Sequence, residues 1–132
     1  MTKEAMKWGT FRVNVQISVN LEILMIKRRN FMKEKLVRDN IPEIIMKDGH
    51  VPHTRVLSDE EYVKQLEIKL LEETNEYLES KDVEELADIL EVIYAISQFK
   101  GVALSELESV RRNKAEKNGS FHKKLLLFDI TS

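Results

Sequence analysis

Acidic residues inside the apolar stripes of two consecutive predicted helices constrain this chain more than any other feature. They read as EExxE and then ExxD within KLLEETNEYLESKDVEELADIL, and they are Glu72, Glu73, Glu76, Glu85 and Asp88. At about 100° per residue, Glu73 falls within about 40° of the apolar residues Leu66 and Tyr77 on its helix. By the same rule, Glu85 falls within about 20° of Val92 and Ile96. Both helices therefore direct carboxylates toward their own core.

A buried carboxylate without a partner costs on the order of several kcal/mol, so it protonates, pairs with a cation or coordinates a metal. Acids on helices usually form a solvated face. Here the acids lie among apolar residues on two successive helices, which favours a specific role for them. Almost no basic residue shares these faces, which favours a divalent cation. Ligands that are all oxygen, with no Cys and no nearby His, suit Mg²⁺ or Mn²⁺ better than Zn²⁺.

The length of 132 residues is sufficient for a single domain with a thin core. No run of 18 or more apolar residues and no signal-like start is present, so we expect a cytoplasmic protein without a membrane partner. The absence of cysteine excludes disulfides, thiolate catalysis and thiolate metal sites. Any chemistry must therefore come from the acids.

Residues 1–31 differ from the rest of the chain. They hold six Lys or Arg and two Glu, a balance of +4 within a total of −2, and residues 11–23 alternate apolar and polar as a strand does. One hypothesis is a strand that pairs with its copy on another subunit. The other is that residues 1–31 are a non-native extension upstream of a natural start at Met32, because Lys27-Arg28-Arg29-Asn30 can be encoded by a purine-rich ribosome-binding sequence. On either hypothesis, residues 32–132 form the domain.

Capping signals predict four helices after Met32, and hence an all-α fold with a loose tail. A short helix is capped by Asp39 or Asn40 and runs to Lys47. Capping boxes start the next three, pairing Ser58 with Glu61, Asp82 with Glu85 and Ser105 with Glu108. Their expected ends are near Ser80, near Lys100 and at Asn118-Gly119.

Basic residues gather around that last helix end, namely Arg111, Arg112, Lys114, Lys117, Lys123 and Lys124. A glycine turn flanked by cations can wrap phosphate oxygens. The helix dipole alone also favours cations at this end. Together with the acids, however, the pattern predicts a phosphate held between a metal and basic side chains.

These motifs resemble the all-α nucleoside triphosphate pyrophosphohydrolases, the superfamily of MazG-like and phosphoribosyl-ATP pyrophosphohydrolase proteins. The resemblance rests on the paired acidic motif, on EVIYAI after it, on the Lys-x-x-Lys turn with Gly and Phe, and on the opening KLVRDNIPEII at residues 35–45. It covers about residues 33 to 130, and the opening is similar to that of a small phosphoribosyl-ATP pyrophosphohydrolase-like branch. It implies an antiparallel helical bundle of four main helices.

The resemblance implies Mg²⁺-dependent cleavage of a nucleoside triphosphate between the α- and β-phosphates, which gives a monophosphate and pyrophosphate. The acids implied to bind the metal are Glu72, Glu73, Glu76, Glu85 and Asp88. Lys114, Lys117 and Gly119 match the family's phosphate-side segment, although the family commonly has Arg-Gly-Gly-Phe where this chain has Asn118-Gly119-Ser120-Phe121. Lys117 or Arg112 is a candidate substitute for that arginine, and Arg38 either pairs locally or reaches a phosphate.

For the base that takes a proton from the attacking water, we consider Glu72 and Glu76, because they lie toward the edge of the stripe. Glu73, Glu85 and Asp88 are then the inner metal ligands. The family typically assembles as homodimers or homotetramers, so we expect at least a dimer. Nucleic acid is not an expected partner because the body of the chain is acidic.

Two other functions stay open at this stage. One is phosphoribosyl-ATP hydrolysis in histidine biosynthesis, which the acidic motif allows. The other is a non-catalytic, metal-stabilised helical module that binds a nucleotide or a protein, which the altered glycine turn favours. A housecleaning nucleotide pyrophosphohydrolase is the function that the opening motif favours.

Overall fold

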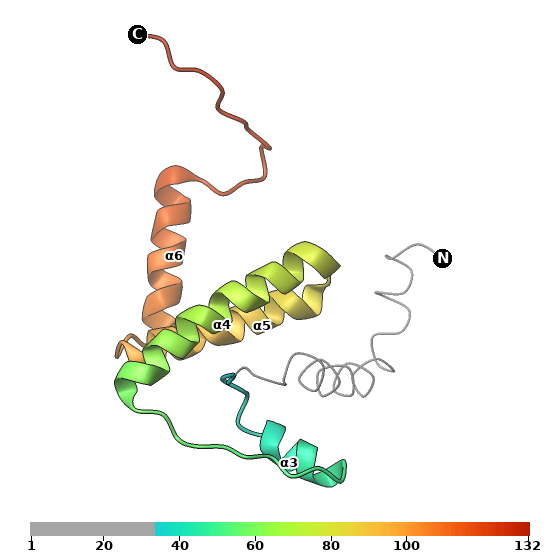
Figure 1. The fold of residues 1–132 in the computed structure, drawn as a ribbon. Helices are drawn as coiled ribbons and strands as arrows, with labels where there is room; N and C mark the ends of the chain where they lie inside the picture. Colours follow the sequence, from blue (N-terminus) through green and yellow to red (C-terminus); the bar gives the residue numbers. More distant parts are fainter. Residues whose placement is uncertain (1–33) are drawn as a thin grey trace.

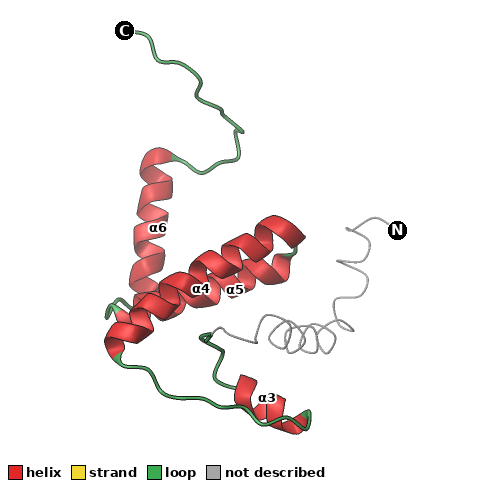
Figure 2. Ribbon diagram, in the orientation of Figure 1, coloured by secondary structure: helices red, strands yellow, loops and turns green. Residues whose placement is uncertain are grey.

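A computed structural model of the chain describes residues 34–132 (Figure 1). The described part contains four helices, α3 (Ile41–Lys47), α4 (Asp59–Ser80), α5 (Val83–Phe99) and α6 (Leu104–Asn118). None of these residues lies in a strand (Figure 2). The expected all-α class with four helices is therefore confirmed. The predicted strand and the boundary between residues 31 and 32 lie outside the described residues.

The first helix forms where the capping signals place it. Asn40 is the N-cap residue of α3 and Pro42 lies in the first turn, where a missing N–H costs nothing. The Asn40 side chain makes no capping hydrogen bond, so proline and the local turn start this helix. The chain leaves it through Gly49, whose φ of 86° suits a residue without a side chain.

The capping box of α4 is confirmed in full. The Ser58 hydroxyl accepts from the backbone N–H of Glu61 at 3.2 Å, and the Glu61 carboxylate accepts from the Ser58 N–H at 3.4 Å. The helix ends at Ser80, and Lys81 follows in the left-handed conformation with φ of 61°. Only two residues, Lys81 and Asp82, connect α4 to α5.

Two other predicted capping boxes are wrong. Asp82 is the N-cap residue of α5, but its side chain makes no capping bond, and Glu85 directs its carboxylate toward other acids instead. The start of α6 is capped by Ala103, one residue before Leu104, and Ser105 lies inside the first turn. The carboxylate of Glu108 accepts two bonds from Arg111, at 2.9 and 2.5 Å. Neither helix start therefore has the reciprocal side-chain bonds of a capping box.

The helices α4 and α5 lie side by side and antiparallel, and they form the hairpin that carries the core (Figure 1). Leu66 of α4 and Val92 of α5 are buried, with 3% and 7% of their surface exposed. Tyr62 packs edge-on against Phe99 with ring centroids 5.6 Å apart, which closes one end of the hairpin.

The last helix contacts α5 near its first turns and then leads away from the hairpin (Figure 1). The Ser97 hydroxyl holds the connection, because it donates to the Val102 carbonyl at 2.9 Å. After Asn118 the chain turns at Gly119, with φ of 85°, into a segment without helix or strand. No helix in the described part of the chain is both long and apolar enough to cross a membrane.

The capping box of α4 provides a test of this fold. We expect Ser58→Ala to lower the free energy of unfolding by about 1 kcal/mol, because the Glu61 N–H loses its acceptor. Ser109→Ala is the matched control, since the Ser109 hydroxyl is exposed and bonds only within its own helix to the Ser105 carbonyl. Urea unfolding followed by circular dichroism measures both changes. Equal effects of the two substitutions would contradict the role of the cap.

Candidate metal centre

Three acids from two helices meet in the part of the hairpin that lies near the connection between α4 and α5. Glu73 comes from α4, and Glu85 and Asp88 come from α5, one turn apart on the same face. Each contributes one carboxylate oxygen to a group whose members all lie within 4.8 Å of one another. The short connection after Ser80 makes α5 antiparallel to α4, so Glu85 and Asp88 come back opposite Glu73. These three are the residues that the sequence assigns as inner ligands.

Glu73 is the buried member of this group. Only 5% of its surface is exposed, which agrees with its place in the apolar stripe. One of its oxygens, Oε1, accepts a hydrogen bond from the Lys69 ammonium at 2.8 Å. The other oxygen, Oε2, is buried and has no partner among the described residues. An unsatisfied buried carboxylate oxygen is costly, and a proton, a cation or a metal ion would each relieve that cost.

The protonation of these acids is shifted by their surroundings. Loss of solvent raises the pKa of Glu85 from its ordinary 4.5 to about 8. Negative charge on the neighbouring carboxylates adds to this effect, from Glu76, Asp88 and Glu73 in that order. Burial also raises the pKa of Glu73, although Lys69 opposes the shift. Near neutral pH the group therefore holds at least one proton that a metal would displace.

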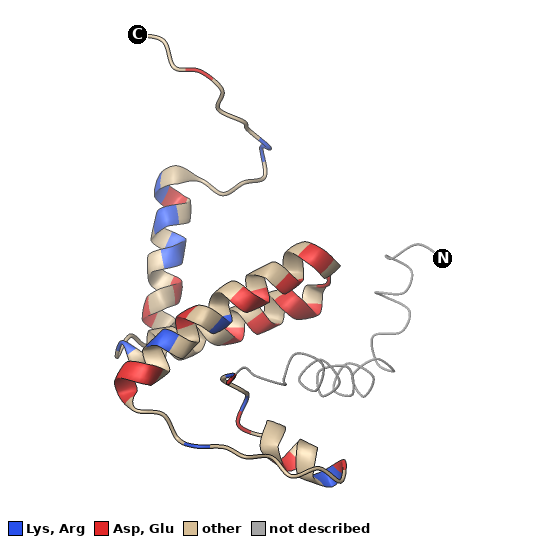
Figure 3. Ribbon diagram, viewed as in Figure 1, with Lys and Arg blue, Asp and Glu red and all other residues tan. Residues whose placement is uncertain are grey.

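Three cations contact the acids, which corrects the expectation that these faces carry almost no basic residue. Lys69 lies 2.8 Å from Glu73 and 3.7 Å from Glu72. The Lys35 ammonium pairs with Glu72. The Arg38 guanidinium lies 2.5 Å from Asp88 Oδ1. Figure 3 shows these charges along the hairpin and the segment before α3.

One of these cations was detectable in the sequence and two were not. Lys69 precedes Glu73 by four residues, so a helix places the two side chains together about 40° apart. The contacts of Lys35 and Arg38 instead cross 37 and 50 residues of chain. No periodicity predicts such pairs, because the path of the chain between α3 and α4 decides them.

The two predicted base candidates differ in their surroundings. Glu72 lies between the ammonium groups of Lys35 and Lys69, with 18% of its side chain exposed. Glu76 lies one turn after Glu73, close enough for its charge to raise the pKa values of Glu73 and Glu85. The charge of Glu76 therefore acts on the three-acid group, whereas Glu72 forms ion pairs with Lys35 and Lys69.

The predicted phosphate-side residues lie elsewhere in the chain. Arg112, Lys114 and Lys117 are exposed on α6, and Gly119 follows at its end. Arg112 is 3.8 Å from Glu108 of the same helix. Figure 3 shows the basic part of α6 well away from the acids of the hairpin. Within residues 34–132 of a single chain, the structure does not bring the predicted phosphate-side residues of α6 close to the acids of the hairpin.

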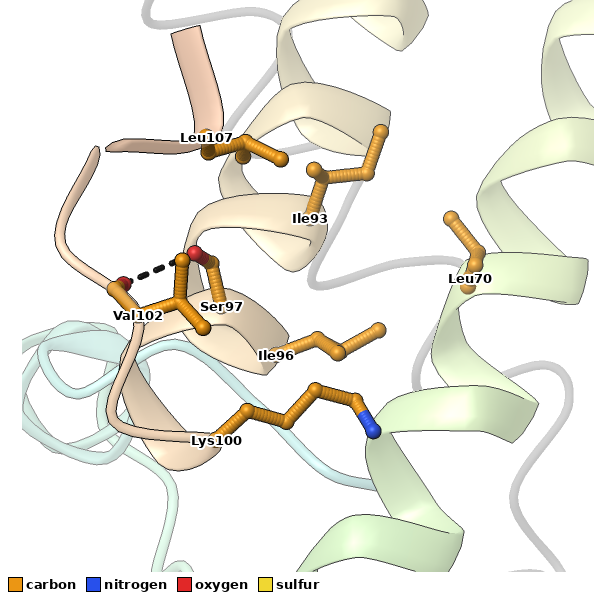
Figure 4. Close-up of a pocket in the computed structure, with 7 residues that line it drawn as sticks. All are labelled: Leu70, Ile93, Ile96, Ser97, Lys100, Val102 and Leu107. Carbon is orange, nitrogen blue, oxygen red and sulfur yellow. Dashed lines mark hydrogen bonds between the residues drawn. The ribbon is translucent and has the colours of Figure 1, made fainter. Parts of the chain in front are cut away.

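An apolar pocket of about 280 Å³ lies between α4, α5 and the start of α6 (Figure 4). Five aliphatic side chains line it together with Ser97 and Lys100, and they are Leu70, Ile93, Ile96, Val102 and Leu107. The Ser97 hydroxyl donates to the Val102 carbonyl. Lys100 is the charged residue of the lining. Sequence reasoning missed this pocket because it depends on where α6 docks.

Comparison with known proteins adds a single partial similarity to these observations. No family model matches the chain, and no solved structure matches it. An uncharacterized protein of Mycolicibacterium smegmatis is 52% identical over 42 residues. That similarity covers 32% of this chain and 43% of the relative, so the chain spans less than half the length of the protein it matches.

The shifted pKa of Glu85 predicts how stability depends on pH. The folded protein keeps a proton on Glu85 up to about pH 8, whereas the unfolded chain releases it near its ordinary value of 4.5. The free energy of unfolding should therefore fall as the pH rises from about 5 to about 8. Glu85→Gln keeps a neutral side chain at every pH, so we expect it to reduce this dependence and to stabilise the protein at pH 8.

Urea unfolding in EDTA at three pH values measures this effect. Glu91→Gln, at an exposed position of α5, is the control and should keep the wild-type dependence. An unchanged slope in Glu85→Gln would show that burial does not hold the proton on Glu85.

Proposed function

We propose that the chain is a Mg²⁺-dependent nucleoside triphosphate pyrophosphohydrolase that releases a nucleoside monophosphate and pyrophosphate. The observation that carries this proposal is the buried Glu73, whose Oε2 has no hydrogen-bond partner in residues 34–132 and whose carboxylate meets Glu85 and Asp88 across the hairpin. Hard cations prefer such an all-oxygen set, and they commonly serve phosphate chemistry. The resemblance of the acidic motif and of KLVRDNIPEII to the pyrophosphohydrolases supports the same reaction.

The donor set fits Mg²⁺, and Mn²⁺ as its substitute. The donor oxygens of the three-acid group all lie within 4.8 Å of one another, and carboxylate oxygens are the ligands that such hard cations prefer. Glu73, Glu85 and Asp88 would hold the ion. When bound, it would neutralise phosphate oxygens and make the attacking water more acidic.

Glu76 is the preferred base in this proposal. It lies close enough to the three-acid group for its charge to raise the pKa of Glu85, whereas Glu72 pairs with both Lys35 and Lys69. Glu76 takes a proton from the attacking water as the water oxygen bonds to phosphorus. When the α-phosphorus is attacked, its bond to the oxygen that bridges to the β-phosphate breaks, and pyrophosphate leaves with the electron pair of that bond. Glu76 then returns the proton to solvent.

Substrate binding needs cations beyond those ligands. Arg38 lies next to Asp88 and can reach a phosphate at the same site. We propose that a second copy of the chain supplies further phosphate contacts to this site. The residues of that copy would be Arg112, Lys114, Lys117 and the Gly119 turn. This follows from their position on α6, which leads away from the acids of its own hairpin (Figure 3).

Assembly into a homodimer or homotetramer is part of the proposal. The C-terminal segment exposes a run of large apolar side chains, with 75% to 96% of their surface accessible, at Phe121, Leu125, Leu126, Leu127 and Phe128. The outer side of α4 exposes more than half of Ile68, Leu71 and Leu78. Such surface is rarely left in water by a folded protein, and a second copy would cover it.

A non-catalytic nucleotide-binding module is the second candidate function. Lys35, Arg38 and Lys69 already compensate part of the acidic charge, and such compensation would also suit a stable site without turnover. Phosphoribosyl-ATP remains an alternative substrate for the same hydrolysis.

Pyrophosphate release tests the reaction. We expect release from at least one compound of a panel of canonical and modified nucleoside triphosphates and phosphoribosyl-ATP, with Mg²⁺ and not with EDTA. Glu73→Gln should lower the rate roughly 100-fold or more, because a neutral amide replaces a metal ligand. Glu79→Gln, at an exposed position on the same helix, should leave the rate unchanged.

The panel also separates the alternatives. Release from phosphoribosyl-ATP alone would favour the histidine-biosynthesis reaction. A folded protein that binds Mg²⁺ and nucleotide but releases no pyrophosphate from any compound would contradict the hydrolase and favour the binding module.

The C-terminal segment tests the assembly. We expect the full chain to elute as a dimer or tetramer and a chain ending at Ser120 to elute as a smaller species, because the apolar run is removed. Light scattering after size exclusion measures the masses. Replacing Lys123 and Lys124 by Gln is the control, since it keeps the apolar run and should keep the mass. A monomeric full chain would contradict the proposed assembly.

A further inference from the structure

Two cations from the segment before α3 reach both helices of the hairpin. Lys35 and Arg38 are three residues apart, yet Lys35 pairs with Glu72 on α4 and Arg38 pairs with Asp88 on α5. The segment therefore bridges the two helices that carry the candidate metal ligands. Asp88 belongs at once to the three-acid group and to the pair with Arg38.

We propose that Lys35 and Arg38 form a cationic clasp, which neutralises the acids when the site is empty and transfers to the phosphate oxygens when a metal–nucleotide complex binds. This inference rests on the proposed function and adds a regulation to it. The clasp makes the free metal a poor ligand and the metal–nucleotide complex a good one.

The first half of the clasp follows from charge. Acids clustered within a few ångströms repel one another, and the contacts from Lys35 and Arg38 reduce that repulsion without a metal. A divalent cation bound by Asp88 would lie close to the Arg38 guanidinium and be repelled by it. Arg38 must then move away from the metal or weaken its binding.

The second half follows from what a triphosphate brings. Its phosphate oxygens carry several negative charges, and a guanidinium binds such oxygens through two parallel hydrogen bonds. Transfer from Asp88 to phosphate therefore replaces one charge-assisted contact by another of at least equal strength. Arg38 has the freedom for this movement, because 48% of its side chain is exposed.

Lys69 differs from the clasp in this respect. It lies on α4 one turn before Glu73, so its pair is fixed by the helix itself. Its exposed fraction of 19% is close to the 20% of Lys35, so its place within α4, and not its burial, sets it apart. Its ammonium therefore stays with Glu73 and Glu72, and we assign it a positioning role. The clasp is limited to the two residues that approach from outside the hairpin.

Two affinities, measured in opposite states of the site, test the clasp. The first is the Kd for Mn²⁺ of the nucleotide-free protein, measured by calorimetry. The second is the Kd for inorganic pyrophosphate at saturating Mn²⁺. We expect Arg38→Gln and Lys35→Gln each to tighten Mn²⁺ binding about fivefold, because a repelling charge is removed. The same variants should weaken pyrophosphate binding about tenfold, because a phosphate partner is lost.

Arg55→Gln is the matched control. Arg55 is an exposed arginine whose ion pairs are to Glu61 and Glu34, away from the three-acid group. It should leave both affinities unchanged. Thermal unfolding in EDTA establishes that each variant is folded before its affinities are compared.

The opposite signs separate the clasp from other roles. If both affinities fall, Lys35 and Arg38 only support the structure, and the clasp is overturned. If either affinity stays at its wild-type value in both variants, the clasp is overturned as well. If the wild-type protein itself fails to bind Mn²⁺, the proposed metal site is overturned and the clasp with it, and this result is distinguishable from the other two.

Discussion

Negative charge buried between α4 and α5 is the constraint on which the rest of the described structure depends. Glu73 occupies a position that a simple amphipathic helix would give to an apolar residue, and it is among the most buried residues described. Because Glu85 and Asp88 face it, the hairpin is held together by apolar contacts around a repulsive centre. Such a centre is stable only with protons, cations or both. The structure shows how each contributes.

Protons and cations divide this task by position. The raised pKa of Glu85 keeps a proton in the group, while Lys69 serves Glu73 from within the same helix. Lys35 and Arg38 lie in the segment before α3 and form ion pairs with Glu72 and Asp88. Under the proposed function, these cations would give way to a metal and a phosphate, which would link the stability of the hairpin to the reaction.

Local rules predicted the helices well because they depend on neighbouring residues. The Ser58 capping box, the ends at Ser80 and Asn118 and the burial of Glu73 all follow from spacing along the chain. The two wrong capping boxes fail in different ways. Asp82 is the N-cap residue of α5 but makes no side-chain capping bond, whereas α6 begins one residue before Ser105, so Ser105 is not its N-cap residue. The Glu85 carboxylate lies within the three-acid group and the Glu108 carboxylate pairs with Arg111.

The sequence by itself determined the all-α class, the four helices and the inward direction of the acids, because each depends on helical periodicity and local capping. It also contained the Lys69–Glu73 pair, four residues apart on α4. Only the tertiary structure decided that Glu73 meets Glu85 and Asp88 within 4.8 Å, that Lys35 pairs with Glu72 and that Arg38 pairs with Asp88. Those contacts depend on how the hairpin packs and how the segment before it runs. Residues far apart in the chain carry no periodic signal of such an encounter.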